Sequence, residues 1–439
     1  MVAVGDLIVT RPLTKAQDPD FGAVIKILRE ADVTFGNMET NIFDIRSFTG
    51  SPQAEYGGAY HASLPELGPD LKEMGFKLLS YANNHTLDWG VEGMRDTCRA
   101  LDHSAIVYAG VGENLAQAGA ARFLETARGR VALVSFASSF TPLSRACDAA
   151  GEAPARPGLN GLRLAKRVVV LPEMLESLRQ LREALPDSQL GVRVTPDAVS
   201  GTVEERPNHL VNGEGSSQVV VAGATYKMGD KVGYSFEADP SDVAGILRNV
   251  RRGKQFADFC IVTNHGHQPG NWSQEPPDYE QSFAHMLIDA GADAYVVHGP
   301  HQLRGIEIYK GRAIFYSVGN FIMDDLRTPV GADMFTAHGK DPRNNTDAEV
   351  TVAEMARGFS DPVFYESVVT VSQFEHNKLA ELRLYPIELG YTKRFANRGI
   401  PRLASTPQAT AILERLQKLS EPFGTEIAIE NDVGVIRLS

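Results

Sequence analysis

Residues 77–90 read Lys77-Leu-Leu-Ser-Tyr-Ala-Asn-Asn-His-Thr-Leu-Asp-Trp-Gly90, and the rest of the chain can be interpreted outward from them. The apolar start, Lys77–Tyr81, predicts a strand, and Val91–Leu101 just beyond has the spacing of an amphipathic helix. A polar turn with Asn84 and His85 lies between them. This order is typical of a parallel α/β sheet, in which turns at the carboxyl ends of strands form the functional crevice.

The same alternation of short apolar runs and helical stretches recurs in both directions along the chain, so we predict the α/β class with a largely parallel sheet. The further strands expected are Val2–Val9, Asp32–Phe35, Ile106–Tyr108, Val131–Ser135, Phe259–Thr263, Tyr295–Val297, Gly305–Tyr309, Ala313–Ser317, Ser367–Gln373 and Leu379–Tyr385. The further helices expected are Phe21–Glu30, Pro65–Gly75, Ser241–Phe256 and Tyr279–Ala290. Pro386 is expected to end its strand, because it cannot donate to a ladder.

We predict one domain over residues 1–390, interrupted twice. An insertion at about 140–225 is rich in Gly, Pro, Ala and Ser, contains one helix at Glu173–Leu185 and is expected near the site opening. A long polar loop at about 324–361 is expected to act as a lid. Residues 391–439, with a helix at Ala409–Leu419, form an extension expected to pack on the same domain.

Composition excludes several classes of protein. The net charge of the 439 residues is −12, which argues against nucleic-acid binding, and the nearest basic run, Arg251-Arg252 with Lys254, is interpreted as the solvated end of a helix. The three cysteines lack metal-clip or redox spacing. No stretch approaches the roughly 18 apolar residues of a membrane span, and no leader features precede the first strand, so a cytoplasmic protein is expected. The oligomeric state is not predicted.

Polar side chains follow the predicted strands at their carboxyl ends, where distant segments meet. Carboxylate, amide and imidazole donors without thiolates suit Mn, Fe, Zn, Ni or Co and, with fewer imidazoles, Mg or Ca. The sequence therefore predicts a site for one or two divalent cations. The residues concerned are Asp6, Glu39, Asn84, His85, His265, His267, His298 and His301.

Several of these segments resemble those of the CapA proteins, a branch of the calcineurin-like metallophosphoesterases named for capsule and poly-γ-glutamate synthesis. The resemblance runs from residue 5 to about residue 321. The matching segments are Gly5-Asp6, Gly36-Asn-Met-Glu39, Tyr60-His61-Ala62, Tyr81-Ala-Asn-Asn-His-Thr-Leu-Asp-Trp-Gly90, Ala109-Gly-Val-Gly112, Arg156-Pro-Gly-Leu-Asn160, Asp289-Ala-Gly-Ala-Asp293, His298-Gly-Pro-His-Gln-Leu-Arg-Gly-Ile-Glu307 and Phe315-Tyr-Ser-Val-Gly-Asn-Phe321.

The resemblance implies a four-layer α/β/β/α sandwich with metals at the strand ends. By position it assigns Asp6, Glu39 and His301 to one metal, and Glu39, Asn84, His265 and His298 to the other. It also implies that His85 is a proton donor and that Asp88 orients or assists it. Ile8 stands where the phosphoesterases have a histidine, so one metal position lacks an imidazole.

Three more residues are candidates for contact with substrate. In the pair His265 and His267 we favour His265 as the ligand and His267 as a catalytic residue facing substrate. His61 is expected to line the pocket. Arg156 could bind a substrate carboxylate through two parallel N–H···O hydrogen bonds, or could anchor its own loop through a salt bridge.

Three functions remain open at this point. The favoured one is a hydrolase that cleaves an amide or phosphoester bond with a metal-activated water, and the resemblance implies a γ-glutamyl or other peptide-like substrate. The second is a metal-dependent peptide epimerase that abstracts a proton next to a carbonyl. The third is a non-catalytic component of capsule assembly; it predicts a membrane anchor, and the sequence shows none.

Overall fold

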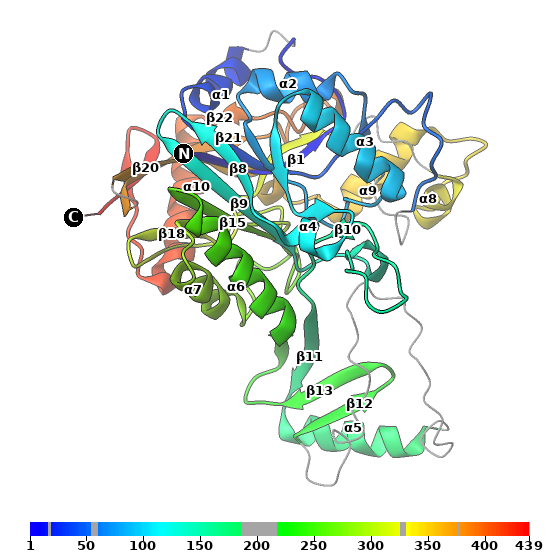
Figure 1. The fold of residues 1–439 in the computed structure, drawn as a ribbon. Coiled ribbons are helices and arrows are strands. Elements are labelled where there is room, and N and C mark those ends of the chain that lie inside the picture. The colour runs from blue at the N-terminus through cyan, green and yellow to red at the C-terminus, as the bar shows by residue number, and fades with distance from the viewer. Residues whose placement is uncertain (16–18, 54–59, 186–216, 325–330, 376–377, 439) are drawn as a thin grey trace.

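The computed structural model describes residues 1–15, 19–53, 60–185, 217–324, 331–375 and 378–438. It shows a mixed α/β protein with several mixed sheets (Figure 1). The largest has ten strands, in the order β23 (Ala428–Glu430), β24 (Val433–Arg437), β21 (Lys378–Glu388), β20 (Glu366–Glu375), β1 (Val2–Val9), β2 (Thr34–Met38), β5 (Leu78–Ser80) and β6 (Val107–Ala109), with β19 (Asn320–Asp324) on β1 and β22 (Arg402–Leu403) on β21.

A second sheet has six strands, in the order β17 (Ile306–Tyr309), β18 (Arg312–Phe315), β16 (Ala294–His298), β15 (Phe259–His265), β9 (Gly129–Ala137) and β8 (Arg122–Thr126). The smaller sheets are β12 (Gln218–Val221), β13 (Ala224–Met228), β11 (Leu164–Val170) and β14 (Gly233–Ala238); β10 (Gly158–Leu159) with β7 (Val111–Gly112); and β3 (Asn41–Ile42) with β4 (Ala62–Ser63).

Three apolar clusters connect the two large sheets to each other and to the helices. One joins the ten-stranded sheet to α1 (Pro19–Arg29), α2 (Leu67–Met74) and α3 (Gly90–His103). Another joins the six-stranded sheet to α6 (Pro240–Gln255) and α7 (Glu280–Asp289). The third contains residues of both sheets and of α10 (Thr406–Ser420). Strand β1 is covered on both faces: its eight residues are all buried, and they are apolar apart from Gly5 and Asp6.

The predicted α/β class is confirmed, but the sheets are less parallel than expected. The pairs β1–β2, β2–β5, β9–β15 and β15–β16 are parallel, whereas β20–β21, β21–β24 and β8–β9 are antiparallel. The antiparallel strands extend the sheets beyond their parallel centres. Parallel pairing aligns the carboxyl ends of neighbouring strands within each sheet, and the packing of the two sheets places β1, β2 and β5 near β15 and β16, where the candidate site lies.

The region expected to be a long polar loop, 324–361, contains two helices in its described part, α8 (Ala332–Ala337) and α9 (Asp347–Gly358). The N-terminus of α9 has a capping box between Thr346 and Glu349, a signal present in the sequence. Met334 of α8 and Val350 of α9 share an apolar cluster with Trp89, which lies four residues after His85. The two helices therefore pack beside the polar turn that carries Asn84 and His85.

Pro386 was expected to end its strand, and this prediction is wrong, because β21 continues to Glu388. Residues 381–384 of β21 pair with β24, and residues 387–388 pair with β22. Pro386 lies between these two partners, and its carbonyl accepts a hydrogen bond from the Ala404 N–H. The missing N–H faces the junction of the two partner strands, where the ladder is interrupted, so proline is tolerated there.

The four-stranded sheet of the insertion continues to Ala238, beyond the boundary expected at about residue 225. The helix expected at Glu173–Leu185 is present as α5 (Pro172–Ala184). This sheet and α5 project from the body of the molecule (Figure 1). In the described part of the chain, no helix is long and apolar enough to cross a membrane.

Candidate metal centre

Three predicted ligands meet between the two large sheets. Asp6 lies in β1, Glu39 directly follows β2, and His265 is the last residue of β15. One donor atom from each lies within 4.8 Å of the others, and all three side chains are buried. We call these three residues the donor cluster. The sequence positions are far apart. The parallel pairing of β1 with β2 brings Asp6 and Glu39 together, and the packing of the six-stranded sheet against the ten-stranded sheet adds His265.

The donor cluster contains buried atoms that lack partners. His265 Nε2 lies 3.1 Å from Glu39 Oε1, but the orientation of the two groups does not give a hydrogen bond. Within the described residues, neither carboxylate oxygen of Glu39 has a hydrogen-bond partner, and His265 Nε2 and Asn84 Oδ1 have none either. Buried polar atoms without partners are costly, so a group that binds all of them would be strongly favoured. A divalent cation fits this donor set.

Burial also shifts the protonation of the two carboxylates. It raises the pKa of Asp6 to about 7, although hydrogen bonds from Asn37 and from the Gly299 N–H oppose the shift. Burial raises the pKa of Glu39 well above its usual value, and the charges of Asp6 and Asp88 add to the effect. Two carboxyl groups that resist ionisation together in a dry site need either protons or a cation.

Asn37 supports the donor cluster and was not singled out from the sequence. Its Nδ2 donates to Asp6 Oδ1 at 2.9 Å and lies 3.1 Å from His265 Nδ1. The Gly299 N–H donates to Asp6 Oδ2 at 3.0 Å. The sequence signal that could have indicated Asn37 is its position in Gly36-Asn-Met-Glu39, a segment already noted for Glu39. The contacts from Asn37 and from the Gly299 N–H fix the orientation of the Asp6 carboxylate.

His85 and Asp88 form a hydrogen-bonded pair beside Asn84. His85 Nδ1 lies 2.7 Å from Asp88 Oδ2, and Asn84 Nδ2 lies 3.1 Å from His85 Nε2. The turn is held by Asn83 Oδ1, which accepts from the His85 N–H, and by Asn41 Nδ2, which donates to the His85 carbonyl. Burial raises the pKa of Asp88, and the neighbouring His85 opposes that shift.

The two other predicted pocket histidines lie beside these groups. The ring centroid of His61 is 4.6 Å from that of His85. The ring of His267 is 4.9 Å from His265 and 5.5 Å from His301. Burial and neighbouring imidazoles hold the pKa of His61 and of His267 well below the usual value, so both rings are neutral near pH 7.

His301 lies next to Asp6 in a constrained conformation. Its Nδ1 is 3.7 Å from Asp6 Oδ2 and 2.8 Å from Asn320 Oδ1, and its φ angle of 58° lies in the left-handed region. Asn320 Nδ2 also donates to the His301 carbonyl and to the Phe364 carbonyl. Asn320 thus holds both the ring and the backbone of His301. The sequence contained it in a matched segment but did not reveal this role.

His298 differs from the expectation for a metal ligand. Its Nδ1 lies 3.1 Å from Thr263 Oγ1, and its Nε2 lies 3.1 Å from the Val4 carbonyl. Both ring nitrogens are therefore engaged by groups outside the donor cluster. Because Nε2 faces a carbonyl it carries the proton, which leaves no nitrogen of His298 directed at a shared cation.

Arg156 is exposed and contacts its own loop. Its Nε donates to the Arg145 carbonyl at 3.1 Å, and its backbone pairs with Cys147. These contacts agree with the loop-anchoring alternative, although the partner is a carbonyl and not the carboxylate of a salt bridge.

Comparison with known proteins gives a family match and several relatives. The family described as bacterial capsule synthesis protein PGA_cap matches residues 1–325. A protein of Sinorhizobium fredii named uncharacterized protein y4sH is 64% identical over 448 residues, covering 100% of this chain and 93% of the relative.

More distant relatives carry names that refer to capsule biosynthesis or to polyglutamine synthesis. The capsule biosynthesis protein CapA of Bacillus anthracis is 24% identical over 331 residues, which are 74% of this chain and 59% of the relative. The probable polyglutamine synthesis accessory protein of Mycobacterium tuberculosis is 26% identical over 320 residues, 72% of this chain and 62% of the relative. The chain thus spans about three fifths of the length of these two relatives.

Proposed function

The chain belongs to the bacterial capsule synthesis protein PGA_cap family, and from that premise we propose that it is a metal-dependent hydrolase of peptide-like (γ-glutamyl or amide) or phosphoester bonds. The observation that supports this most is the set of buried donor atoms without partners in the donor cluster. We propose with it that the two large sheets and their helices form the four-layer sandwich of the metallophosphoesterases.

Asp6, Glu39 and His265 would hold the cation, and Asn84 Oδ1 is the fourth donor that the unpaired atoms suggest. When bound, a cation such as Mn, Fe, Zn, Mg or Ca lowers the pKa of its water and polarises a carbonyl or phosphoryl oxygen. His301, next to Asp6, is the residue available to a second cation. With Ile8 in place of a histidine and His298 engaged elsewhere, we favour a single cation.

His85 and Asp88 would move the proton. Asp88 accepts the Nδ1 proton of His85, so the neutral ring presents the lone pair of Nε2. Asn84 Nδ2 contacts that same nitrogen, so one amide connects the donor cluster to the proton-transfer pair. His85 can take a proton from the attacking water or return one to the leaving group. His61 and His267, both neutral, would face the substrate.

The test combines metal analysis with an activity panel. Protein purified without chelator is analysed for bound metal and is then assayed with γ-glutamyl peptides, other peptides and phosphoesters. We expect about one divalent cation per chain and hydrolysis in one class, with both lost in Glu39→Gln. The matched control is Glu307→Gln, since Glu307 is also buried beside a histidine, His285, but lies outside the donor cluster.

The same samples decide between hydrolysis and the other functions. Peptide incubated in deuterated water that gains deuterium at Cα without cleavage would replace the hydrolase proposal with epimerisation. Metal binding with no turnover of any substrate would favour a non-catalytic role. A Glu39→Gln variant that keeps its metal would contradict the assignment of the donor cluster.

A further inference from the structure

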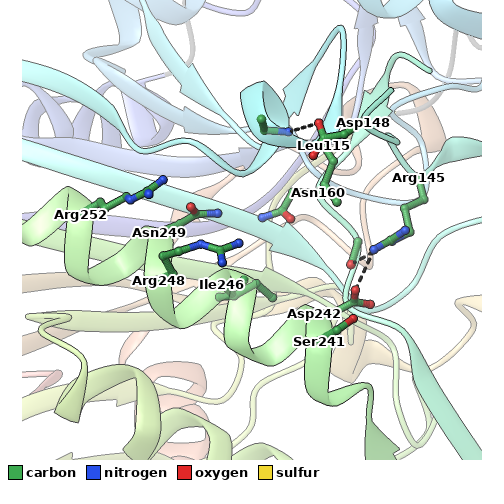
Figure 2. Close-up of a pocket in the computed structure, with 13 residues that line it drawn as sticks. Leu115, Arg145, Asp148, Asn160, Ser241, Asp242, Ile246, Arg248, Asn249 and Arg252 are labelled. Carbon is green, nitrogen blue, oxygen red and sulfur yellow. Dashed lines mark hydrogen bonds and ion pairs between the residues drawn. The ribbon is translucent and has the colours of Figure 1, made fainter. Parts of the chain in front are cut away.

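A cavity of about 220 Å³ lies beside α6, and none of its lining residues belongs to the donor cluster (Figure 2). It is lined on one side by Arg248, Asn249 and Arg252 of α6, and on the other by Asn160 and by the first residues of α4 (Leu115–Gly119). We call it the arginine pocket.

The acidic residues of the arginine pocket already have partners. Asp242 accepts from Arg145 at 2.7 Å and from both Nε and Nη2 of Arg163 at 2.8 Å. Asp148 Oδ1 accepts from the Ala116 N–H at 2.8 Å. These carboxylates are therefore engaged without the remaining arginines.

Arg248 and Arg252 have no such partners: over the described residues, no carboxylate forms an ion pair with either. They are four residues apart on α6, so their side chains lie on one face and their charges repel. Figure 2 shows both projecting from α6, with Asn249 between them in sequence. Arg248 and Arg252 are both exposed, and in a chain with 55 acidic residues against 43 Lys and Arg neither has a carboxylate partner among the described residues, so both guanidinium groups are available to an anion from solution.

We propose that the arginine pocket binds the oxyanion group, phosphate or carboxylate, of a small ligand. A guanidinium offers paired N–H donors that match two oxygens of either group, and the Asn249 amide adds a neutral donor. The ligand would neutralise the repelling pair. The volume suits a small group and not a folded partner. The inference goes beyond the proposed hydrolysis and does not depend on it.

Calorimetric titration of the full chain with inorganic phosphate, and separately with a tri-glutamate peptide, tests the proposal. Each titration is repeated in Glu39→Gln, so that anions held by a bound metal are recognised. We expect at least one probe to bind at low salt and to bind more weakly as salt is added. The double variant R248A/R252A should weaken this binding at least tenfold.

Two controls make the outcome decisive. Arg251→Ala removes an arginine of the same helix that does not line the cavity, and should leave the affinity unchanged. The variant R248K/R252K keeps the charges but loses the paired donors, and should bind severalfold more weakly than the wild type. Phosphate binding or peptide binding identifies the source of the oxyanion. Binding of neither probe, or equal losses in R251A and R248A/R252A, would overturn the proposal.

Discussion

The ends of β15 and β16 carry two histidines that pair in register, His265 and His298, and their surroundings are opposite. Both are about 1% exposed, and burial lowers the pKa of both. His298 has a partner for each ring nitrogen, Thr263 and the Val4 carbonyl. His265 has an Nε2 without a hydrogen-bond partner among the described residues, 3.1 Å from a carboxylate that also lacks one.

This contrast separates a candidate ligand from a core histidine where position and burial agree. A histidine whose two ring nitrogens are both hydrogen-bonded needs no ion to satisfy them. A histidine with a buried, unpaired nitrogen is stabilised by a further partner such as a cation. Variants of the two histidines and of their neighbours test whether the distinction is functional.

Truncating the two histidines separately should have the strongest consequence. His265→Ala should lower cation affinity by more than the roughly 100-fold that loss of an outer contact can cost. His298→Ala should change affinity less than about tenfold while destabilising the fold by about 2 kcal/mol. Chelator competition measures the first and denaturant unfolding the second. Equal losses of affinity would abolish the distinction.

A third histidine, His85, differs from both because, together with Asp88, it would act in proton transfer and not in cation binding. Asp88→Asn should keep cation affinity but reduce kcat by about 100-fold, since the amide no longer stabilises a charged imidazole. Steady-state kinetics on the substrate found in the activity panel measures this. A loss confined to cation affinity would instead place Asp88 with the ligands.

The pH dependence of cation affinity follows from the carboxylates around His265. Asp6 has a pKa of about 7 without a cation, so below pH 7 a proton must leave on binding. Affinity should fall about tenfold per pH unit below 7, and more steeply if Glu39 also loses a proton. Competition titrations at pH 6, 7 and 8 check the slope; a flat profile would contradict it.

The same shift in Asp6 has a consequence for the stability of the metal-free fold. Because the folded state holds this proton more tightly than the unfolded chain does, the stabilising contribution is fully present below the ordinary pKa of 3.8. The contribution is lost as pH rises through the folded-state value of about 7. A cation therefore adds most to the stability of the fold above pH 7, where it replaces that proton.

The weakest effect should come from the partner of His298. Thr263→Val removes the hydroxyl that contacts His298 Nδ1 and should lower the free energy of unfolding by about 1 kcal/mol. Cation affinity should not change. Urea unfolding gives the stability and chelator competition gives the affinity; a tenfold loss of affinity would show that His298 serves the metal site.

Local sequence signals predicted most strands and helices. They failed where a contact with a distant segment determined the secondary structure. The strands at 2–9 and 131–135 and the helix at 241–256 are present as β1, β9 and α6, because each has a clear apolar pattern. The helix α9 was missed although its capping box was visible, because its apolar residues are few and pack near Trp89 from a distant segment. The prediction for Pro386 was wrong because the two strands that pair around it come later in the chain.

The amino-acid pattern alone was enough to indicate which side chains could serve chemistry, since polar residues at the ends of apolar strands stand out. It pointed to Asp6, Glu39 and His265 together with His298, with nothing to rank one above another. The folded chain separates them, because the first three converge on one point while the last is bonded to Val4. The orientation and hydrogen-bond partners of a buried ring depend on backbone groups hundreds of residues away, and no local pattern encodes them.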